Sequence, residues 1–344
     1  MALHALKHVP LQGAASWARG PVAAPFLRWE NSDHRQGEKL PGAIRGEGCV
    51  MGGPISVTHV STFGGWGGGD GEFYKPCHMA FDPTGNLYIA DGGAGLVKKH
   101  DPQGGYLAKL GQGEGGWLRK TGKLNSPTGV AIAQDGSCYV TDVKLNTVFR
   151  FGADGTLMAQ FGSKGKRNGE LDRPRSVRID AEGCLWMLDA YNHRVQRFDP
   201  EGRFMLTFGA RGDDPEGRGM FNDPGDIAID AEGRLFVADT WHNCVQVFDP
   251  QGTFLGRFGV EGRAEGQLIW PRGLAFDVGG SLWVVERANH RVQAFDTDGR
   301  FLYAFGRRGG GDGELEEPYG IAIRGPDLYV SDNGNHRLQR FTIA

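Results

Sequence analysis

The chain has 344 residues, of which 57 are glycine and 17 are proline, and its formal net charge is −3. So much glycine without a three-residue period is typical of many tight turns and excludes a collagen-like or mainly helical chain. The nearly balanced charge gives no global electrostatic reason to bind nucleic acid or a membrane surface. No run of 18 apolar residues predicts a transmembrane helix.

Residues 1–29 contain Lys7, Arg19 and Arg28 but no acidic residue. They lack the continuous apolar stretch of a secretory signal peptide. Their composition is weakly similar to that of a transit peptide, and the simpler interpretation is a flexible basic extension.

The cysteines are few and show no paired spacing: Cys49, Cys77, Cys138, Cys184 and Cys244. An odd number without such spacing argues against a disulfide framework, and the lack of a Cys-x-x-Cys motif argues against a zinc ribbon. This usage favours a reducing, cytoplasmic setting.

Six similar segments follow one another along the chain, and each begins at a proline: Pro76, Pro127, Pro174, Pro224, Pro271 and Pro318. Successive prolines are 47 to 51 residues apart, which matches the period of a four-stranded propeller blade. The sequence therefore predicts an all-β fold, a six-bladed β-propeller.

Each repeat carries the signals of four short strands. An apolar run follows the proline, as at residues 129–132, and a turn such as residues 180–183 leads to a β-rich run that ends in a carboxylate, as at residues 235–239. A third strand leads into an Asp-Pro-x-Gly turn, as at residues 199–202, where proline fixes φ and glycine permits positive φ. A fourth strand ends in Phe-Gly, which completes an antiparallel blade.

One position of the second strand is aromatic in every repeat: Tyr88, Tyr139, Trp186, Phe236, Trp283 and Tyr329. A ladder of rings that stacks ligands is one interpretation. Because the column recurs in all blades, and each ring can bury roughly 150–250 Å², we expect it to pack between neighbouring blades.

The last repeat lacks a fourth strand, because the chain ends at residues 341–344 after the third. The missing Phe-Gly stands at residues 63–64, ahead of the first repeat. We therefore expect residues 57–64 to complete the last blade and so to remove two exposed sheet edges. This divides the chain into an irregular extension, residues 1–56, and a propeller, residues 57–344.

The repeat resembles the NHL family. Residues 189–198 read Asp-Ala-Tyr-Asn-His-Arg-Val-Gln-Arg-Phe and carry the full pattern, and residues 286–295 and 332–341 nearly match it. The resemblance covers residues 57–344 and implies the six-bladed propeller. It implies little about function, since one scaffold carries many activities.

Two columns of chemically active residues have a structural explanation. A carboxylate ends every second strand: Asp91, Asp142, Asp189, Asp239, Glu286 and Asp332. Recurrence in every blade favours acceptors for backbone N–H groups over a ring of metal ligands. His193, His290 and His336 share a column with Gly95, Asn146 and Asn243, residues that all tolerate positive φ, so we expect a left-handed turn there.

The candidate binding face carries the blade prolines and the terminal carboxylates, because an antiparallel first strand starts where the second ends; we call it the proline face. The central channel opens there, which makes its mouth the default site. The positions that break the repeat are His78 and Asp226, in opposite blades, and Arg175 and Arg272, which we expect to flank Asp226. Two guanidinium groups suit a carboxylate or phosphate ligand, although we slightly favour the alternative that they form ion pairs with neighbouring acids, including Asp226.

The turns after the terminal carboxylates add further candidate ligand contacts to the proline face: Tyr191, Trp241, His242 and Arg287. Trp241 beside His242 is unique among the blades and, if exposed, would contact a ligand or partner. It could equally pack against a neighbouring loop.

Three functions remain open. The first is a module that binds a protein, a peptide or a small anionic ligand at the proline face. The second is a lyase or hydrolase that acts on an anionic or peptide substrate there. The third is RNA binding through a basic cluster, Lys164, Lys166, Arg167, Arg173 and Arg175, which we regard as weak because acidic runs offset it.

One known enzyme family resembles this chain in part. Peptidyl-hydroxyglycine amidating lyases are similar NHL propellers, and the resemblance implies a zinc held by histidines directly after the blade prolines, with Tyr and Arg nearby. Here that column has no histidine: Cys77, Thr128, Arg175, Gly225, Arg272 and Tyr319. His78 is one residue out of register, and a single histidine is a poor zinc site. It is the candidate ligand for one zinc or calcium in the channel, and His78, Arg175, Asp226, Arg272 and Tyr319 are the candidate catalytic residues.

Overall fold

The computed structural model describes residues 55–113, 122–212 and 218–344. The described residues all belong to one compact unit, Val50–Ala344. The predicted irregular extension, residues 1–56, lies outside the described residues apart from its last two, and so does Cys49.

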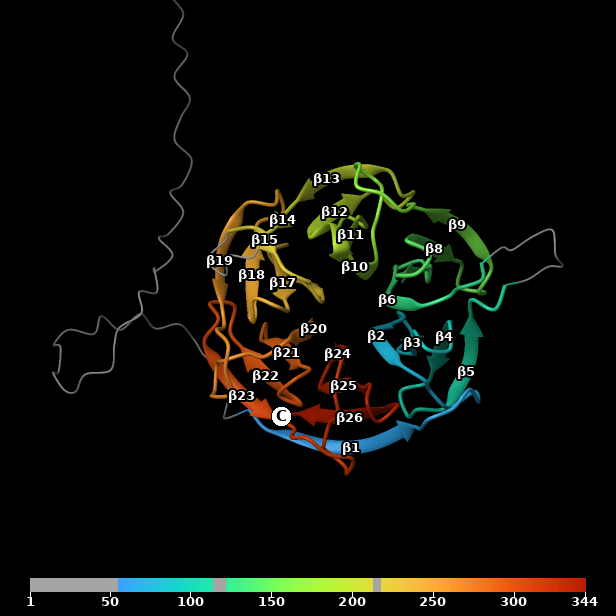
Figure 1. Cartoon of the computed structure of the whole chain (residues 1–344). Coiled ribbons are helices and arrows are strands. Elements are labelled where there is room, and N and C mark those ends of the chain that lie inside the picture. The colour runs from blue at the N-terminus through green and yellow to red at the C-terminus, as the bar shows by residue number, and fades with distance from the viewer. Residues whose placement is uncertain (1–54, 114–121, 213–217) are drawn as a thin grey trace, which may run out of the picture. The chain divides into compact units, whose positions relative to one another are not determined.

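Six antiparallel sheets of four strands surround a central channel (Figure 1). The strands of blades 1 to 3, from the channel outward, are β2 (Pro76–Phe81), β3 (Leu87–Asp91), β4 (Leu96–His100), β5 (Tyr106–Leu110); β6 (Pro127–Ile132), β7 (Cys138–Asp142), β8 (Thr147–Phe151), β9 (Leu157–Phe161); and β10 (Pro174–Ile179), β11 (Leu185–Asp189), β12 (Arg194–Phe198), β13 (Phe204–Phe208).

Those of blades 4 to 6 are β16 (Ile227–Ile229), β17 (Leu235–Asp239), β18 (Cys244–Phe248), β19 (Phe254–Phe258); β20 (Pro271–Phe276), β21 (Leu282–Glu286), β22 (Arg291–Phe295), β23 (Phe301–Phe305); and β24 (Ile321–Arg324), β25 (Asp327–Asp332), β26 (Arg337–Ile343), β1 (Val57–Gly64). The predicted six-bladed propeller is thus confirmed.

The described ranges also hold small features outside the blades. A short parallel pair joins β14 (Ala210–Arg211) to β15 (Met220–Phe221), and a single 3-10 turn spans Ala190–Asn192. None of the helical segments in the described residues is long and apolar enough to cross a membrane.

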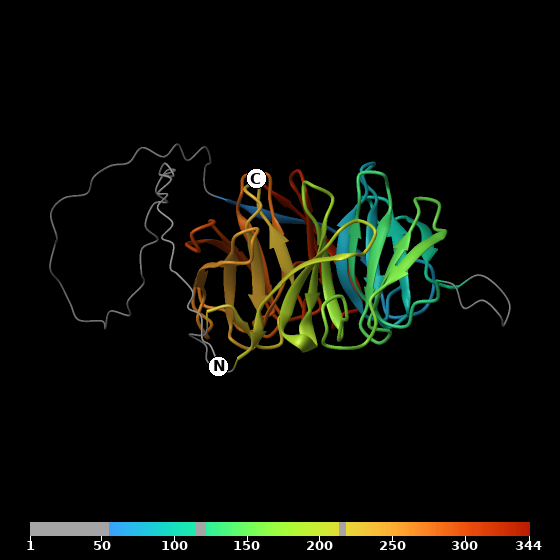
Figure 2. The same cartoon turned by 90° about the horizontal axis from the view of Figure 1, so that it is seen from above.

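The turns between strands follow from their sequences. In the Asp-Pro-x-Gly turn of blade 3, the Asp199 carboxylate accepts the backbone N–H groups of Glu201 and Arg203 at 3.0 and 2.8 Å. Gly202 takes a φ of 85°, a conformation that costs a residue with a Cβ more than it costs glycine. Such turns reverse the chain at one face of the ring. Figure 2 views the ring from the side and shows the strands ending at its two faces.

The core lies between the blades. The six aromatic residues of the predicted column are at most 4% exposed, and Tyr88, for example, packs with Val130 and Val140 of the next blade. Buried polar tips have partners: the Trp186 indole N–H donates to the Asp180 carboxylate at 3.0 Å. The column is therefore packing and not a ligand ladder.

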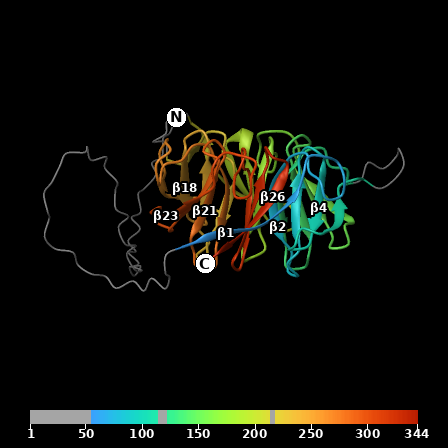
Figure 3. The same ribbon diagram turned by 90° about the horizontal axis from the view of Figure 1, so that it is seen from below.

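The last blade is completed by the strand from the beginning of the described chain, as the repeat pattern suggests. β1 pairs antiparallel with β26, so the outer strand of blade 6 precedes blade 1 in sequence (Figure 3). Ser56 and Ala344 extend this ladder by exchanging backbone hydrogen bonds of 2.8 and 3.0 Å. The pairing gives both edge strands a hydrogen-bonded neighbour.

Candidate functional site

The strand register confirms the proline face. Pro76 pairs with Asp91 and Pro174 with Asp189 in their sheets, so the residues after each proline and after each terminal carboxylate share one end of the blades.

The terminal carboxylates are buried structural acceptors. The Asp332 carboxylate is fully buried and accepts the Glu316 N–H at 2.7 Å, with further hydrogen bonds from Arg337 at 2.7 Å and Gln339 at 3.1 Å. The Asp142 carboxylate accepts two N–H groups of its following turn, as predicted. These lone pairs are used by the protein itself, which supports the structural interpretation of the column.

The left-handed column is also confirmed. Its φ values lie between 53° and 69° at Gly95, Asn146, His193, Asn243, His290 and His336. The histidines there position the backbone: His193 Nδ1, for instance, lies 3.1 Å from the Phe221 carbonyl oxygen.

Asp223 is the centre of the candidate site. Arg175 at the start of β10 and Arg272 at the start of β20 both reach its carboxylate, with N–O distances of 2.7 and 3.1 Å. Burial by itself would raise the pKa of Asp223, but the two guanidinium charges outweigh it and lower this pKa. Two cations therefore share one anion, which leaves the cluster with a positive charge.

The expectation that the two arginines flank Asp226 is wrong. Asp223 stands just before Pro224 with a φ of 52° and places its carboxylate on the proline face. Asp226 lies beyond the proline, directly before β16, and is fully buried. The ion-pair alternative named the correct interaction but included the wrong acid.

Within this cluster, Arg272 has buried nitrogen atoms that lack hydrogen-bond partners among the residues that the structure describes. The residue is 7% exposed, and its Nε and Nη1 are buried without a hydrogen-bond partner in the described residues. Burial lowers its pKa, and its guanidinium lies over the ring of Tyr319 at 5.7 Å. Burial also raises the pKa of Tyr319. The protonated Tyr319 phenol and the Arg272 guanidinium, which has unused hydrogen-bond donors, thus lie together at the mouth of the channel.

The structure brings two more candidates to this cluster. The Trp241 indole N–H donates to Asp223 at 3.0 Å and its side chain is 59% exposed. Tyr191 is 43% exposed and receives the Arg175 guanidinium over its ring at 5.7 Å.

Two other candidates are engaged elsewhere. His242 is buried against the terminal carboxylate of its own blade, with Nδ1 2.7 Å from Asp239 Oδ2. Arg287 forms an ion pair with Glu317 of blade 6. The geometry gives both of them structural contacts, and Arg287 also lies close enough to Arg272 for its charge to act on that guanidinium.

Deeper in the channel, Asp226 receives four hydrogen bonds. Its Oδ1 accepts the Ser176 hydroxyl at 2.5 Å and the Ile227 N–H at 2.8 Å. Its Oδ2 accepts the Arg178 guanidinium at 2.7 Å and the Leu274 N–H at 3.0 Å. Burial would raise the pKa of Asp226, but the Arg178 charge, His78 and Ser176 outweigh it and lower the pKa to about 2.

This donor set does not fit a zinc or calcium ion. His78 Nδ1 lies 3.3 Å from Asp226 Oδ2, but both oxygens of Asp226 already serve protein donors, and the Arg178 cation stands where a metal would need anionic ligands. In the described residues, the one group of three metal-binding side chains within reach of each other is Asp180, Glu182 and Cys184. Arg197 already pairs with Asp180 and Glu182 of that group.

Arg178 is the residue that sequence reasoning missed. It stands fourth after its blade proline, where the other five repeats have alanine: Ala80, Ala131, Ala228, Ala275 and Ala322. That break in an alanine column was a visible signal. The small residues leave room for one long side chain, which crosses the channel to Asp226 and the Leu274 carbonyl oxygen.

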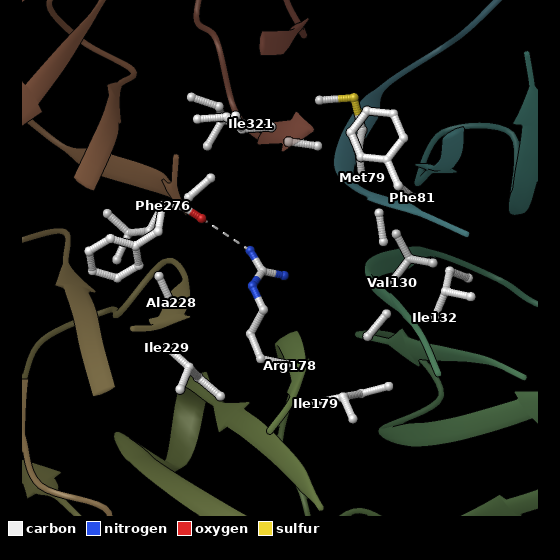
Figure 4. A pocket seen from close by; sticks show the side chains of 16 residues that line it. Met79, Phe81, Val130, Ile132, Arg178, Ile179, Ala228, Ile229, Phe276 and Ile321 are labelled. Carbon is white, nitrogen blue, oxygen red and sulfur yellow. Dashed lines mark hydrogen bonds between the residues drawn. The ribbon is translucent and has the colours of Figure 1, made fainter. Parts of the chain in front are cut away.

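A cavity of about 360 Å³ occupies the channel on the side of Arg178 away from the proline face. The ends of all six inner strands line it, and Figure 4 shows Arg178 projecting among apolar side chains such as Phe81, Ile229 and Phe276. The open volume therefore lies beyond the Asp226 network, whereas the clustered charges lie at the predicted mouth.

The basic cluster considered for RNA is partly neutralised. Arg167 pairs with Glu170 at 2.7 Å and Arg175 with Asp223, and Arg173 donates to the Tyr191 hydroxyl at 2.7 Å. The two ion pairs reduce the charge available to phosphate groups.

Comparison with known families supports the fold. The SMP-30/Gluconolactonase/LRE-like region model matches residues 70–211, and the NHL repeat model matches residues 221–248 and 268–295. The chain is thus a propeller that contains NHL repeats, as the repeat pattern indicated. It has no significant match among curated proteins.

Solved structures with a similar fold include enzymes. Virginiamycin B lyase from Staphylococcus aureus is 14% identical with a TM-score of 0.56, covering 84% of this chain and 100% of that one. A gluconolactonase from Xanthomonas campestris is 15% identical with a TM-score of 0.58, covering 85% and 98%. At these identities the likeness shows the fold alone.

Proposed function

We propose that this propeller binds a small carboxylate at the mouth of its channel on the proline face, through Arg272 and Arg175. The observation that carries the proposal is the pair of buried, unpartnered nitrogen atoms on Arg272. An unsatisfied buried donor costs about 1–3 kcal/mol, and an anionic oxygen would remove that cost. The free carboxylate of a peptide C-terminus offers the same chemistry as a small organic acid.

The test compares acetate binding to matched glutamine variants by calorimetric titration. Arg272→Gln removes the guanidinium but leaves Asp223 paired with Arg175, so we expect a folded protein with at least tenfold weaker acetate binding. Arg300→Gln is the control, because Arg300 is 70% exposed on the Asp-Pro-x-Gly side. Wild-type protein that binds no acetate, or an Arg272→Gln protein that binds it unchanged, contradicts the proposal.

A second candidate is a hydrolase or lyase at the same place. The match to the SMP-30/Gluconolactonase/LRE-like region favours it, as does Tyr319 beside two arginines. In such a reaction the arginines would stabilise negative charge that develops on the substrate, and the Tyr319 hydroxyl would donate a proton.

The enzyme candidate is tested by following proton release from glucono-δ-lactone, with and without added divalent cations. Turnover that is lost in Tyr319→Phe supports an enzyme. Absence of turnover in a protein that binds acetate leaves the binding function.

A further inference from the structure

Two exposed indole rings stack beside the carboxylate site. Trp241 and Trp270 have ring centroids 6.4 Å apart and an interplanar angle of 25°. Their exposed fractions are 59% and 41%, whereas Trp186 and Trp283 are at most 1% exposed. We call this pair the tryptophan shelf. Exposed apolar rings that lie together mark a contact for a ligand or partner.

The shelf adjoins the arginines through Asp223. The Trp241 indole N–H and the Arg272 guanidinium reach the same atom, Asp223 Oδ2, at 3.0 and 3.1 Å. Trp270 stands two residues before Arg272 and has a φ of 54°, which is unusual for a bulky side chain. The backbone conformation recurs at this position in other blades, at Arg173 and Glu317, so the fold dictates the turn while this blade alone fills it with an indole.

The two parts of this surface select different parts of one ligand. The face of an indole is negative, so it repels a carboxylate and attracts an apolar ring or a ring edge. The guanidinium groups attract the carboxylate.

We infer that the anion bound on the proline face carries a flat apolar ring, and that this ring lies on the tryptophan shelf. The inference rests on the proposed function and names the class of ligand: a small aromatic carboxylate.

The experiment compares 2-naphthoate with acetate by calorimetric titration. We expect wild-type protein to bind naphthoate at least tenfold more tightly. Trp270→Ala should reduce this advantage to less than threefold while acetate affinity stays unchanged, and Trp270→Phe, which keeps a ring, should retain most of it. Trp66→Ala is the matched control, because Trp66 is 70% exposed but packs edge-on against Tyr74 in the segment between β1 and β2, before blade 1.

The outcomes separate the two proposals. Equal affinity for the two anions in the wild type, or a naphthoate advantage that survives Trp270→Ala, contradicts binding of the ring on the tryptophan shelf. Neither result contradicts the proposed carboxylate site. Failure to bind either anion overturns both. Loss of the advantage in Trp66→Ala as well as Trp270→Ala also counts against the shelf, since it would show that the effect is not local.

Discussion

His78 and Asp226 meet across the central channel, with Nδ1 of the histidine 3.3 Å from Oδ2 of the aspartate. They belong to blades 1 and 4, and both are fully buried. The two residues therefore connect blades that are far apart in sequence and opposite in the ring. Arg178 of blade 3 completes the network, so four strands of the inner ring converge on one carboxylate.

Acid should weaken the fold through Asp226. Its pKa is lowered from 3.8 to about 2 in the folded protein, so its contribution is fully present above about pH 4 and is lost as the pH falls through 2. The linked free energy is about 2 kcal/mol. We expect the urea-unfolding free energy of Asp226→Asn to fall less than that of the wild type between pH 4 and pH 2.

At neutral pH the same variant should be less stable by about 3 kcal/mol, because it leaves the Arg178 cation without its anion. Two variants serve as controls. Asp298→Asn changes an exposed carboxylate and should preserve the wild-type acid response. The double variant Asp226→Asn with Arg178→Ala should lose less than the sum of the single losses, since the residues are in contact. Strict additivity, or identical acid responses in wild type and Asp226→Asn, would contradict this account.

Closure by β1 predicts a sharp difference between two deletions. Removal of residues 1–50 takes away no described strand, so we expect a soluble, folded protein. Removal of residues 1–64 exposes the edge of β26 and takes away Val57 and Phe63, which pack against core clusters that include Phe341 and Leu338. An unpaired edge promotes aggregation. Size-exclusion chromatography and circular dichroism compare the two, and equal solubility would argue against closure.

The repeat made most of the fold predictable, because spacing, turn chemistry and the aromatic column all indicate the same blade. Even the left-handed turns at His193 and His336 could be inferred from the residue types that share their column. The site was harder to predict because it depends on small departures from the repeat. Asp223 and Asp226 are three residues apart, and only the backbone around Pro224 decides which one faces the arginines.

Arg178 is a second residue whose role in the site could not be predicted from the sequence alone. Its position in a column of alanines was visible, but the reach of a long side chain across the channel depends on how closely the blades approach each other. Trp270 likewise looked like an ordinary residue before a proline. Its exposure and its stacking on Trp241 follow from packing between blades 4 and 5, which the sequence of either blade alone does not specify.

Buried and exposed ion pairs of this propeller should contribute differently to its stability. Arg337 is 13% exposed and pairs with the fully buried Asp332 at 2.7 Å, and it also donates to the carbonyl oxygens of Gly311 and Glu314. Arg300 is 70% exposed and approaches Asp296 at 3.5 Å. Arg337→Ala should lower the free energy of unfolding by about 3 kcal/mol, because it leaves a buried carboxylate without its cationic partner. Arg300→Ala should lower it by less than about 0.5 kcal/mol. Urea unfolding at pH 7 measures both losses, and similar values would show that the terminal carboxylates do not depend on their arginine partners for stability.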